Sequence, residues 1–363
     1  MSSANTTTNL LKELEGNRDV DAALLAQLLA VRGADCELIR AAALACMSQY
    51  AGDAVYFRGL VEVTNGCRHN CYYCGIRRDA PVERYRVTEA DILAAAHNCN
   101  RLGFGSMVLQ SGELNTDAYV DFICRVVSRI KRETISDALP DGLGITLSIG
   151  VLSLKQYQRL FDAGAHRYLL RLETSNPGLF EAIHPPEQSL AQRLEAIACL
   201  KEVGYQVGTG VMIGLPGQTH RMLAEDVLMF RQLDVDMVGM GPFLPAADTP
   251  MAEVPIPSVE ERLQLGLNMI AVTRLVCRDI NIASTTALEG LHPRGRLKGL
   301  EYGANVAMPN LTPLNLRKYY MLYNDKPITQ SVDDAVAAIE SIGRKVALNQ
   351  FGDSRHFFQR TEE

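Results

Sequence analysis

Apolar side chains recur at helical spacing over the first fifty residues. Leucines stand three and four residues apart at Leu10, Leu11 and Leu14, and again within residues 24–29. Apolar positions with this spacing fall on one face of an α-helix. The pattern predicts a helical N-terminal extension, which we place at residues 1–57.

From residue 58 the pattern changes to short apolar runs separated by longer amphipathic stretches. This alternation is typical of parallel βα units, in which a buried strand is followed by a helix packed on one face. Eight runs are predicted as strands: residues 59–64, 105–110, 144–149, 167–172, 206–213, 236–242, 280–285 and 304–308.

Several intervening helices have sequence features that mark their first residue. Three pairs fit the capping box, in which a hydroxyl and a side chain three residues later satisfy free backbone N–H groups: Ser153 with Gln156, Ser189 with Gln192, and Ser258 with Glu261. Thr88 with Asp91 is a weaker version. Eight strands alternating with helices predict an α/β fold, a (β/α)8 TIM-type barrel over residues 58–330, followed by a C-terminal helix and tail over 331–363. An open doubly wound sheet would show the same alternation.

The composition is that of a globular protein with a small excess of acidic groups. Of the 363 residues, 47% are hydrophobic, and 36 Lys and Arg stand against 42 Asp and Glu, which gives a net charge of −6. A nucleic-acid-binding protein normally has a basic excess, so we expect no nucleic acid partner. The first residues lack the basic and apolar regions of a signal peptide, and glycines and Pro216 interrupt the longest uncharged run. We therefore expect a cytoplasmic protein without membrane contact.

Three cysteines directly after the first predicted strand are the most informative feature. Cys67, Cys71 and Cys74 have the spacing C-x3-C-x2-C, so their thiols can converge on one metal centre. Thiolates bind both zinc and iron–sulfur clusters. A structural zinc site requires four protein ligands, whereas three cysteines on a cubane cluster leave one iron open. His69 is available as a fourth zinc ligand, but its place between two of the cysteines makes simultaneous ligation difficult.

The cysteine spacing, with the aromatic Tyr73 before the third thiol, resembles the CxxxCxxC motif of the radical SAM superfamily. Its position favours the same interpretation, because functional sites in barrels of this type lie on loops at the C-terminal ends of the strands. The other six cysteines stand singly on helix-like segments, where a free cysteine is typically a small buried hydrophobic residue: Cys36, Cys46, Cys99, Cys124, Cys199 and Cys277. An odd number of cysteines without a secretory signal argues against a disulfide framework.

The next predicted strand ends carry further polar chemistry. The second strand ends in Ser111, Gly112 and Glu113, which resembles the Gly-Gly-Glu-like segment that holds the methionine amino group of S-adenosylmethionine (SAM) in radical SAM proteins. The third strand ends in Ser148, Ile149 and Gly150. Each segment is also compatible with an ordinary turn.

The fourth predicted strand ends with two charged residues on the same face, Arg171 and Glu173. Charges at such a position are costly unless they are paired or functional. Either they form an ion pair at the barrel mouth, or they hold SAM or the substrate. Arg193 on the following helix has the donor geometry to bind a carboxylate, or it is a solvated helix residue.

The remaining strand ends are uncharged. The fifth is followed by Gly214, Leu215 and Pro216, a glycine turn into a helix that offers backbone N–H donors. The last three strands end in segments such as Ser284-Thr285-Thr286 and Met308-Pro309-Asn310, which fit either a pocket lining or ordinary turns.

Read in order from about residue 60 to 315, the chain resembles the HydE family of FeFe-hydrogenase maturases, in the biotin-synthase-like group of radical SAM enzymes. The N-terminal helical extension also matches. The later segments separate this family from its relatives, because the cysteine motif and Ser-Gly-Glu are widely shared. The segments are CRHNCYYCGIRRDA, LQSGE, ITLSIG, HRYLLRLETSNP, VGTGVMIGLPGQT, DMVGMGPFLPAADTP, NIASTTA and GANVAMPNLTP.

The resemblance implies one four-iron four-sulfur cluster on the three cysteines, with SAM on the open iron and reductive cleavage of SAM to a 5′-deoxyadenosyl radical. It implies a cysteine-bound iron carbonyl cyanide complex as substrate, for the diiron subcluster of the hydrogenase. The implied partners are other maturases and an electron donor such as a ferredoxin or flavodoxin. The expected SAM contacts are Tyr73, Ser111, Gly112, Glu113, Ser148, Arg171, Glu173, Arg193, Gly214, Leu215 and Pro216, and the expected substrate cavity includes Thr285, Thr286 and Met308.

Two departures from the family and two rival functions remain. Some members have C-terminal cysteines for a second cluster, but here the last cysteine is Cys277, and a histidine found in some relatives is Leu172. A methylornithine-synthase-like mutase would need charges for its amino-acid substrate, whereas these strand ends are rich in Gly, Thr and Met and favour an uncharged or weakly charged guest. A non-catalytic metal-binding scaffold would leave SAM without effect.

Overall fold

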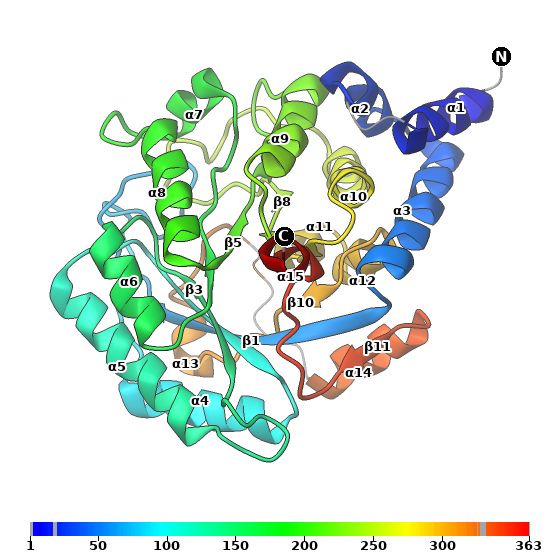
Figure 1. The fold of residues 1–363 in the computed structure, drawn as a ribbon. Helices are drawn as coiled ribbons and strands as arrows, with labels where there is room; N and C mark the ends of the chain where they lie inside the picture. The colour runs from blue at the N-terminus through cyan, green and yellow to red at the C-terminus, as the bar shows by residue number, and fades with distance from the viewer. Residues whose placement is uncertain (1–2, 17–19, 325, 327–331, 363) are drawn as a thin grey trace.

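The computed structural model describes residues 3–16, 20–324, 326 and 332–362 (Figure 1). Three helices precede the sheet, as the leucine spacing predicts: α1 (Ser3–Gly16), α2 (Ala22–Leu29) and α3 (Cys36–Tyr50), with a short 3-10 turn at Gly33–Asp35. Helix α2 packs against α9 and α3 packs against α10, so the N-terminal helices cover one side of the molecule.

Eight parallel strands form the ring at the centre of the fold. Each pairs in parallel with the next, and the last returns to the first: β1 (Ala54–Thr64), β2 (Ser106–Ser111), β3 (Gly144–Ser148), β4 (Arg167–Leu169), β5 (Gln206–Thr209), β7 (Met237–Val238), β9 (Asn281–Ile282) and β10 (Val306–Ala307). A bridge between Ala283 and Val306 joins β9 to β10, and the Ser284 N–H donates to the Val306 carbonyl at 2.9 Å. The predicted barrel is confirmed, and the open doubly wound alternative is wrong.

Two of the predicted strands are interrupted. The runs 206–213 and 236–242 each divide, and their second halves pair separately as β6 (Met212–Ile213) and β8 (Gly241–Pro242). The break lies where Gly210 meets Gly239, because a Cβ on Gly210 would stand 1.9 Å from the Gly239 carbonyl oxygen. This approach of two backbones requires glycine.

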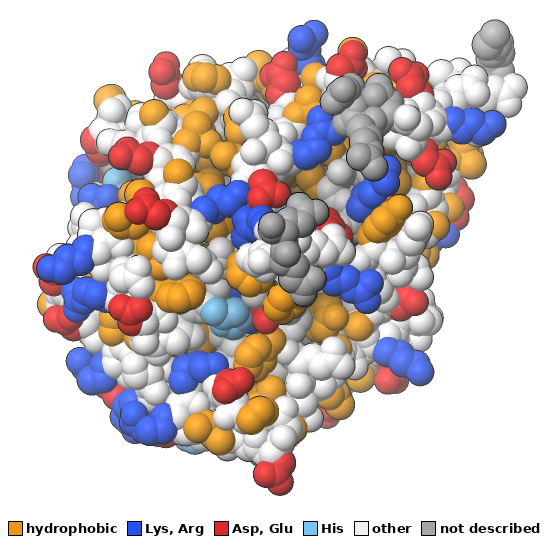
Figure 2. Space-filling model, in the orientation of Figure 1, with side chains coloured by type: hydrophobic (Ala, Val, Ile, Leu, Met, Phe, Trp, Pro, Cys, Tyr) orange, Lys and Arg blue, Asp and Glu red, His pale blue; other side chains and the backbone are white. Residues whose placement is uncertain are grey.

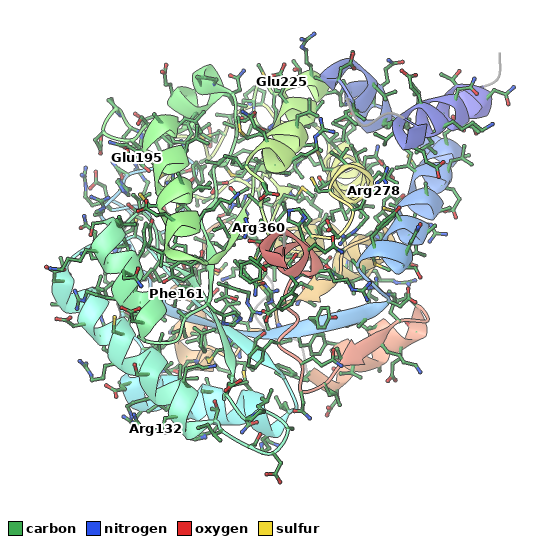
Figure 3. All side chains as sticks on the ribbon, viewed as in Figure 1. Arg132, Phe161, Glu195, Glu225, Arg278 and Arg360 are labelled. Carbon is green, nitrogen blue, oxygen red and sulfur yellow. The ribbon has the colours of Figure 1, made fainter. Side chains whose placement is uncertain are left out.

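Helices surround the ring, and their start signals are confirmed. All three capping boxes are formed, and the Thr88 side chain accepts a hydrogen bond from the Asp91 N–H. Glu195 on α8 and Glu225 on α9 point away from the barrel (Figure 3). The helices are α4 (Glu89–Arg101), α5 (Asp117–Glu133), α6 (Leu154–Asp162), α7 (Pro177–Ile183), α8 (Leu190–Val203), α9 (His220–Gln232), α10 (Val259–Val276), α11 (Thr286–Leu291), α12 (Gly295–Glu301) and α13 (Leu314–Arg317).

The C-terminal part is more structured than a single helix and tail. The predicted boundary at 330/331 lies outside the described residues, and residues 332–362 form α14 (Val332–Ser341), β11 (Lys345–Ala347) and α15 (Arg355–Glu362). Strand β11 pairs with β1, and α15 lies over the N-terminal end of the barrel, where His356 contacts Asp234 at 2.6 Å (Figure 1). A three-residue strand leaves no periodic pattern, so the sequence does not reveal it.

The face of the molecule that carries α15 has a mixed surface, with basic and acidic side chains interspersed (Figure 2). No helix in the described part of the chain is long and apolar enough to cross a membrane.

Candidate active site

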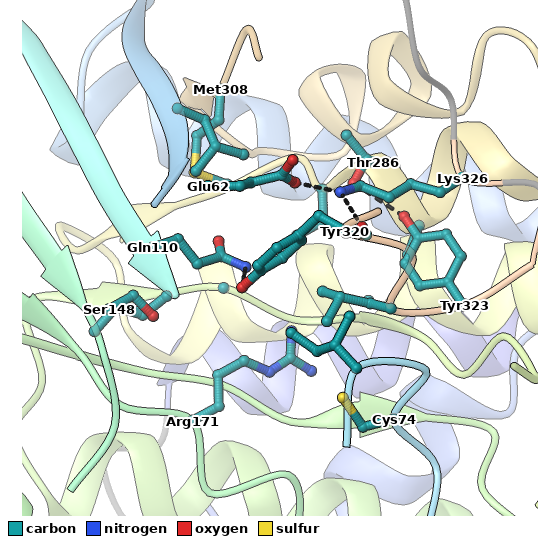
Figure 4. A pocket seen from close by; sticks show the side chains of 18 of the residues that line it. Glu62, Cys74, Gln110, Ser148, Arg171, Thr286, Met308, Tyr320, Tyr323 and Lys326 are labelled. Atoms are coloured by element: carbon teal, nitrogen blue, oxygen red, sulfur yellow. Dashed lines mark hydrogen bonds and ion pairs between the residues drawn. The ribbon is translucent and has the colours of Figure 1, made fainter. Parts of the chain in front are cut away.

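A cavity of about 330 Å³ opens at the C-terminal ends of the strands (Figure 4). Its wall includes every residue that the sequence analysis expected to hold the cluster, SAM or the substrate, except Gly214, Leu215 and Pro216. Candidate residues as far apart in the sequence as Cys67 and Met308, which are 241 positions apart, therefore line the same cavity. The barrel explains this arrangement, because loops after successive parallel strands meet at the same end.

The three cysteines lie on the loop between β1 and α4, and all line the cavity. The loop is fixed to its surroundings: the Tyr72 N–H donates to the Ile183 carbonyl, and the Gly75 N–H donates to the Leu322 carbonyl, both at 3.0 Å. Burial raises the pKa of the Cys71 thiol to about 11 and raises that of Cys74 well above its usual range. At neutral pH these groups remain thiols until a cation displaces the proton.

Three cysteine thiols are suitable ligands for an iron–sulfur cluster, although their sulfur atoms are not gathered around one point in this structure. Among the residues that the structure describes, no group of three or more His, Cys, Asp or Glu side chains is placed to hold a metal ion. Three soft donors nevertheless lie on one loop and face one cavity. Gln188 donates to the Cys71 sulfur at 3.0 Å, the kind of contact that accompanies thiolate ligands. His69, the fourth ligand that the zinc alternative would need, has its Nε2 atom 2.6 Å from Glu113 Oε1.

Glu113 is a buried, ionised carboxylate at the end of β2. It accepts from Arg68 Nη2 at 2.8 Å as well as from His69. Burial alone would raise the pKa of Glu113, but the hydrogen bonds from His69 and Arg68 and the charge of Arg193 lower it to about 2. Gly150 adjoins this carboxylate, and its φ of 96° belongs to the left-handed region that glycine adopts without strain.

Arg171 and Glu173 form an ion pair, which is one of the two alternatives that the sequence analysis left open for them. Arg171 Nη2 lies 2.9 Å from Glu173 Oε2. Both residues lie beyond β4, which ends at Leu169, so the strand is shorter than the predicted run 167–172. Glu173 has a φ of 68°, an uncommon conformation for a residue with a side chain, and such strain is found most often at functional sites. The conformation is held by two backbone bonds, from the Glu173 N–H to the Gly210 carbonyl at 3.0 Å and from the Met212 N–H to the Glu173 carbonyl at 2.9 Å.

Arg193 extends from α8 to the same wall of the cavity. Its guanidinium donates to the Arg171 carbonyl and to Gln188 Oε1, both at 3.0 Å. Burial alone would lower the pKa of Arg193, but nearby Tyr73 and Glu113 outweigh this and raise it. The side chain is therefore a positioned cation and not a solvated helix residue.

The loop after β6 lies away from the cavity wall. Gln218 Oε1 accepts from the N–H groups of Gly214 and Leu215, at 2.7 and 3.1 Å. Leu215 packs in a small apolar cluster that also contacts Tyr73. In this structure the backbone donors of the loop are used by the chain itself.

Two contributors near the site were missed by the sequence analysis. Asp226 on α9 accepts from the backbone N–H and the hydroxyl of Ser175, at 2.6 and 2.7 Å, and so fixes the turn that follows Glu173. Burial raises the pKa of Asp226 to about 7. Gln188 links Cys71 to Arg193. Asp226 is a buried polar residue on an amphipathic helix and Gln188 lies on the loop before α8, and neither belongs to a local sequence motif.

The far part of the cavity is charged, which corrects the expectation of an uncharged lining. Thr285, Thr286 and Met308 are present, but so are four charged side chains: Glu62, Arg296, Arg317 and Lys326. These charges come from β1, α12, α13 and the segment that follows α13, not from the strand ends considered in the sequence. Tyr320 and Tyr323 lie beside Lys326 (Figure 4).

Comparison with known proteins agrees with this geometry. The radical SAM superfamily profile matches residues 61–230. The chain is 41% identical over 317 residues to the FeFe-hydrogenase maturase subunit HydE of Thermotoga maritima, covering 85% of this chain and 86% of that protein. The chain belongs to the HydE family of radical SAM enzymes. Like other members of the HydE family it is a SAM-dependent iron–sulfur enzyme, which excludes the non-catalytic scaffold.

More distant relatives share the fold of this HydE-family chain. The 3-methylornithine synthase of Methanosarcina acetivorans is 26% identical over 264 residues, 71% of this chain and 70% of that one. The structure of the maturase HydG from Carboxydothermus hydrogenoformans superposes with a TM-score of 0.81 at 19% identity, over 97% of this chain and 82% of that one. The methylornithine synthase PylB superposes with a TM-score of 0.77 at 22% identity, over 94% and 98%.

Proposed function

We propose that this enzyme cleaves SAM reductively and uses the resulting radical to convert a cysteine-bound iron carbonyl cyanide complex, during assembly of the diiron subcluster of FeFe hydrogenase. The observation that carries the proposal is the single cavity that has three thiols at one part of its wall and charged and hydroxyl groups at another. A cavity of this kind holds a cofactor and a substrate in direct contact, and shields a radical from water.

In this proposal Cys67, Cys71 and Cys74 hold one four-iron four-sulfur cluster. When bound, the cluster supplies the electron that divides SAM into methionine and a 5′-deoxyadenosyl radical. Glu113 is ionised and buried, so it is suited to bind the ammonium group of the methionine moiety. Its own partners, Arg68 and His69, hold it in place.

The remaining cofactor contacts follow from the same wall of the cavity. Glu173 and Arg171 offer a carboxylate and a guanidinium beside the thiols, and Arg193 fixes the Arg171 backbone. Ser111, Gly112, Ser148 and Tyr73 complete the proposed SAM site. The loop of Gly214, Leu215 and Pro216 takes part only if Gln218 releases its backbone donors.

The substrate end is proposed to be formed by Thr285, Thr286 and Met308. Thr286 already accepts a hydrogen bond from the Tyr323 hydroxyl at 3.0 Å, so its hydroxyl is oriented. Other maturases would deliver and receive the iron complex, and a ferredoxin or flavodoxin would supply electrons.

A second function, an amino-acid mutase of the methylornithine-synthase type, is favoured by one observation. The charged pair of Glu62 and Lys326 in the cavity is what a charged amino acid requires. The 41% identity to HydE, against 26% to the 3-methylornithine synthase, favours the maturase.

The two functions are distinguished by anaerobic turnover. The reconstituted and reduced protein would be incubated with SAM and either a synthetic cysteine-ligated iron carbonyl cyanide complex or L-lysine. The maturase predicts that 5′-deoxyadenosine forms with the iron complex, together with a new low-spin iron species. Formation of 5′-deoxyadenosine with L-lysine and not with the iron complex would contradict it. The variant Cys71→Ala should form none in either case.

A further inference from the structure

A buried ion pair closes the part of the cavity that is lined by hydroxyl and aromatic side chains. Glu62, from β1, and Lys326, from the segment after α13, are 1% and 8% exposed, and Lys326 Nζ donates to Glu62 Oε1 (Figure 4). Lys326 also donates to the Tyr320 carbonyl at 2.9 Å and lies 4.9 Å from the centre of its ring. Both charged residues line the cavity.

The pair has unused hydrogen-bonding capacity on both sides. Glu62 Oε2 is buried and has no partner among the described residues. An ammonium group has three N–H donors. Within the described part of the chain, Lys326 Nζ donates to two acceptors, Glu62 Oε1 and the Tyr320 carbonyl. A buried carboxylate oxygen without a partner is costly, because it has lost its water without gaining a donor.

A purely structural role does not explain this arrangement. Replacing a buried ion pair by apolar residues of the same volume is often neutral or stabilising, so stability alone gives little reason to keep one. A pair that served only to fasten the segment after α13 onto β1 would satisfy both carboxylate oxygens. Here the unused acceptor of Glu62 and the unused donor of Lys326 belong to two neighbouring groups of opposite charge. Both groups lie in the wall of a substrate-sized cavity.

We propose that Glu62 and Lys326 bind the amino-acid end of the substrate. Glu62 Oε2 accepts an N–H of the amino group, and the remaining donor of Lys326 Nζ binds the carboxylate. The two adjacent opposite charges of an α-amino acid match the two opposite charges of the pair. A metal-bound amine is no longer an ammonium but retains its N–H groups, so an amino acid coordinated to iron through nitrogen keeps the hydrogen bond to Glu62 without the charge match.

The inference rests on the proposed function in one respect, that this cavity is the substrate site. Beyond the proposed function, Glu62 is assigned to the amino group of the substrate and Lys326 to its carboxylate. Thr286 and Tyr323 adjoin the pair in Figure 4 and are left to contact the rest of the substrate.

Three small thiols test the proposal by binding alone. L-cysteine has both groups, 3-mercaptopropionate lacks the amine, and cysteamine lacks the carboxylate. Their dissociation constants would be measured by anaerobic calorimetry on the reconstituted protein saturated with S-adenosylhomocysteine. Because one hydrogen bond to a charged group is involved in each comparison, the wild type should prefer L-cysteine over either analogue by about tenfold to a hundredfold.

Two variants assign the preference to residues. In Glu62→Gln the amide oxygen stays with Lys326 while the NH₂ group faces the substrate amine, so the preference over 3-mercaptopropionate should vanish. In Lys326→Met, which keeps the length without the charge, the preference over cysteamine should vanish. The inference is overturned if the wild type shows no preference for L-cysteine, binds none of the probes, or keeps both preferences in the variants.

A matched control separates recognition from folding. Asp353→Asn removes the carboxylate of another largely buried ion pair, with Arg167, outside the cavity wall. It should lower the melting temperature yet leave both preferences intact. Loss of the preferences in this control as well would attribute them to stability and overturn the inference. If the preferences follow Glu62 and Lys326 but the iron complex is not turned over, the proposed maturase function fails while the recognition of an amino acid stands.

Discussion

Replacing Gly150 by alanine should weaken SAM binding by displacing Glu113. An alanine Cβ at this position would lie 2.1 Å from Glu113 Cγ and 2.5 Å from Cδ and Oε2. Real non-bonded carbon atoms do not approach so closely, so the buried carboxylate must move away from its place beside Arg68 and His69.

The magnitude follows from two separable effects. The φ of 96° at Gly150 costs any other residue about 1–2 kcal/mol, which lowers stability. Moving Glu113 removes one hydrogen bond between charged groups from the proposed SAM site, worth about 1.5–3 kcal/mol. The dissociation constant for SAM should therefore rise by about tenfold to a hundredfold.

Gly343→Ala is the matched control. Gly343 also has a positive φ, 76°, and an added Cβ there meets no atom within 4 Å. Both variants should lose thermal stability, but only Gly150→Ala should bind SAM more weakly in equilibrium dialysis. If Gly150→Ala binds SAM as tightly as Gly343→Ala does, Glu113 does not hold the cofactor.

Three further outcomes are expected. Cys67→Ala should abolish cluster assembly and SAM cleavage, seen as loss of iron and sulfide, whereas Cys199→Ala on α8 should change neither; retained cleavage would refute the ligand assignment. Glu173→Ala should weaken SAM binding about tenfold, and an unchanged dissociation constant would leave its ion pair as purely structural. The pKa of His356 is raised to about 9, chiefly by the hydrogen bond to Asp279. Its stabilising effect is therefore complete below pH 6.5 and is lost as the pH rises through 9. The variant His356→Ala should lose about 1–2 kcal/mol of unfolding free energy at low pH and little above pH 9. If the pH dependence of unfolding is the same in the variant and the wild type, the contact does not stabilise the fold.

Local features of the fold were predictable because each depends on a few consecutive residues. The capping boxes at Ser153, Ser189 and Ser258 are complete within four residues, and each is formed. The interruption of two strands at Gly210 and Gly239 was not predictable, because it depends on a contact between neighbouring strands.

The candidate site divides in the same way. The cysteine loop and Glu113 follow from short motifs, and the structure brings them to one cavity. Glu62 and Lys326 are 264 residues apart, and neither lies in a motif, so only the fold reveals the pair. The role of Asp226 likewise depends on the packing of α9 against the turn after Glu173.

Electron paramagnetic resonance of the anaerobically reconstituted and reduced protein, recorded with and without SAM, tests the central claim most directly. A four-iron four-sulfur cluster on Cys67, Cys71 and Cys74 with one open iron predicts a cluster spectrum that changes when SAM is added. The absence of a cluster spectrum, or a spectrum that SAM leaves unchanged, would contradict the assignment of this cavity as a radical SAM active site.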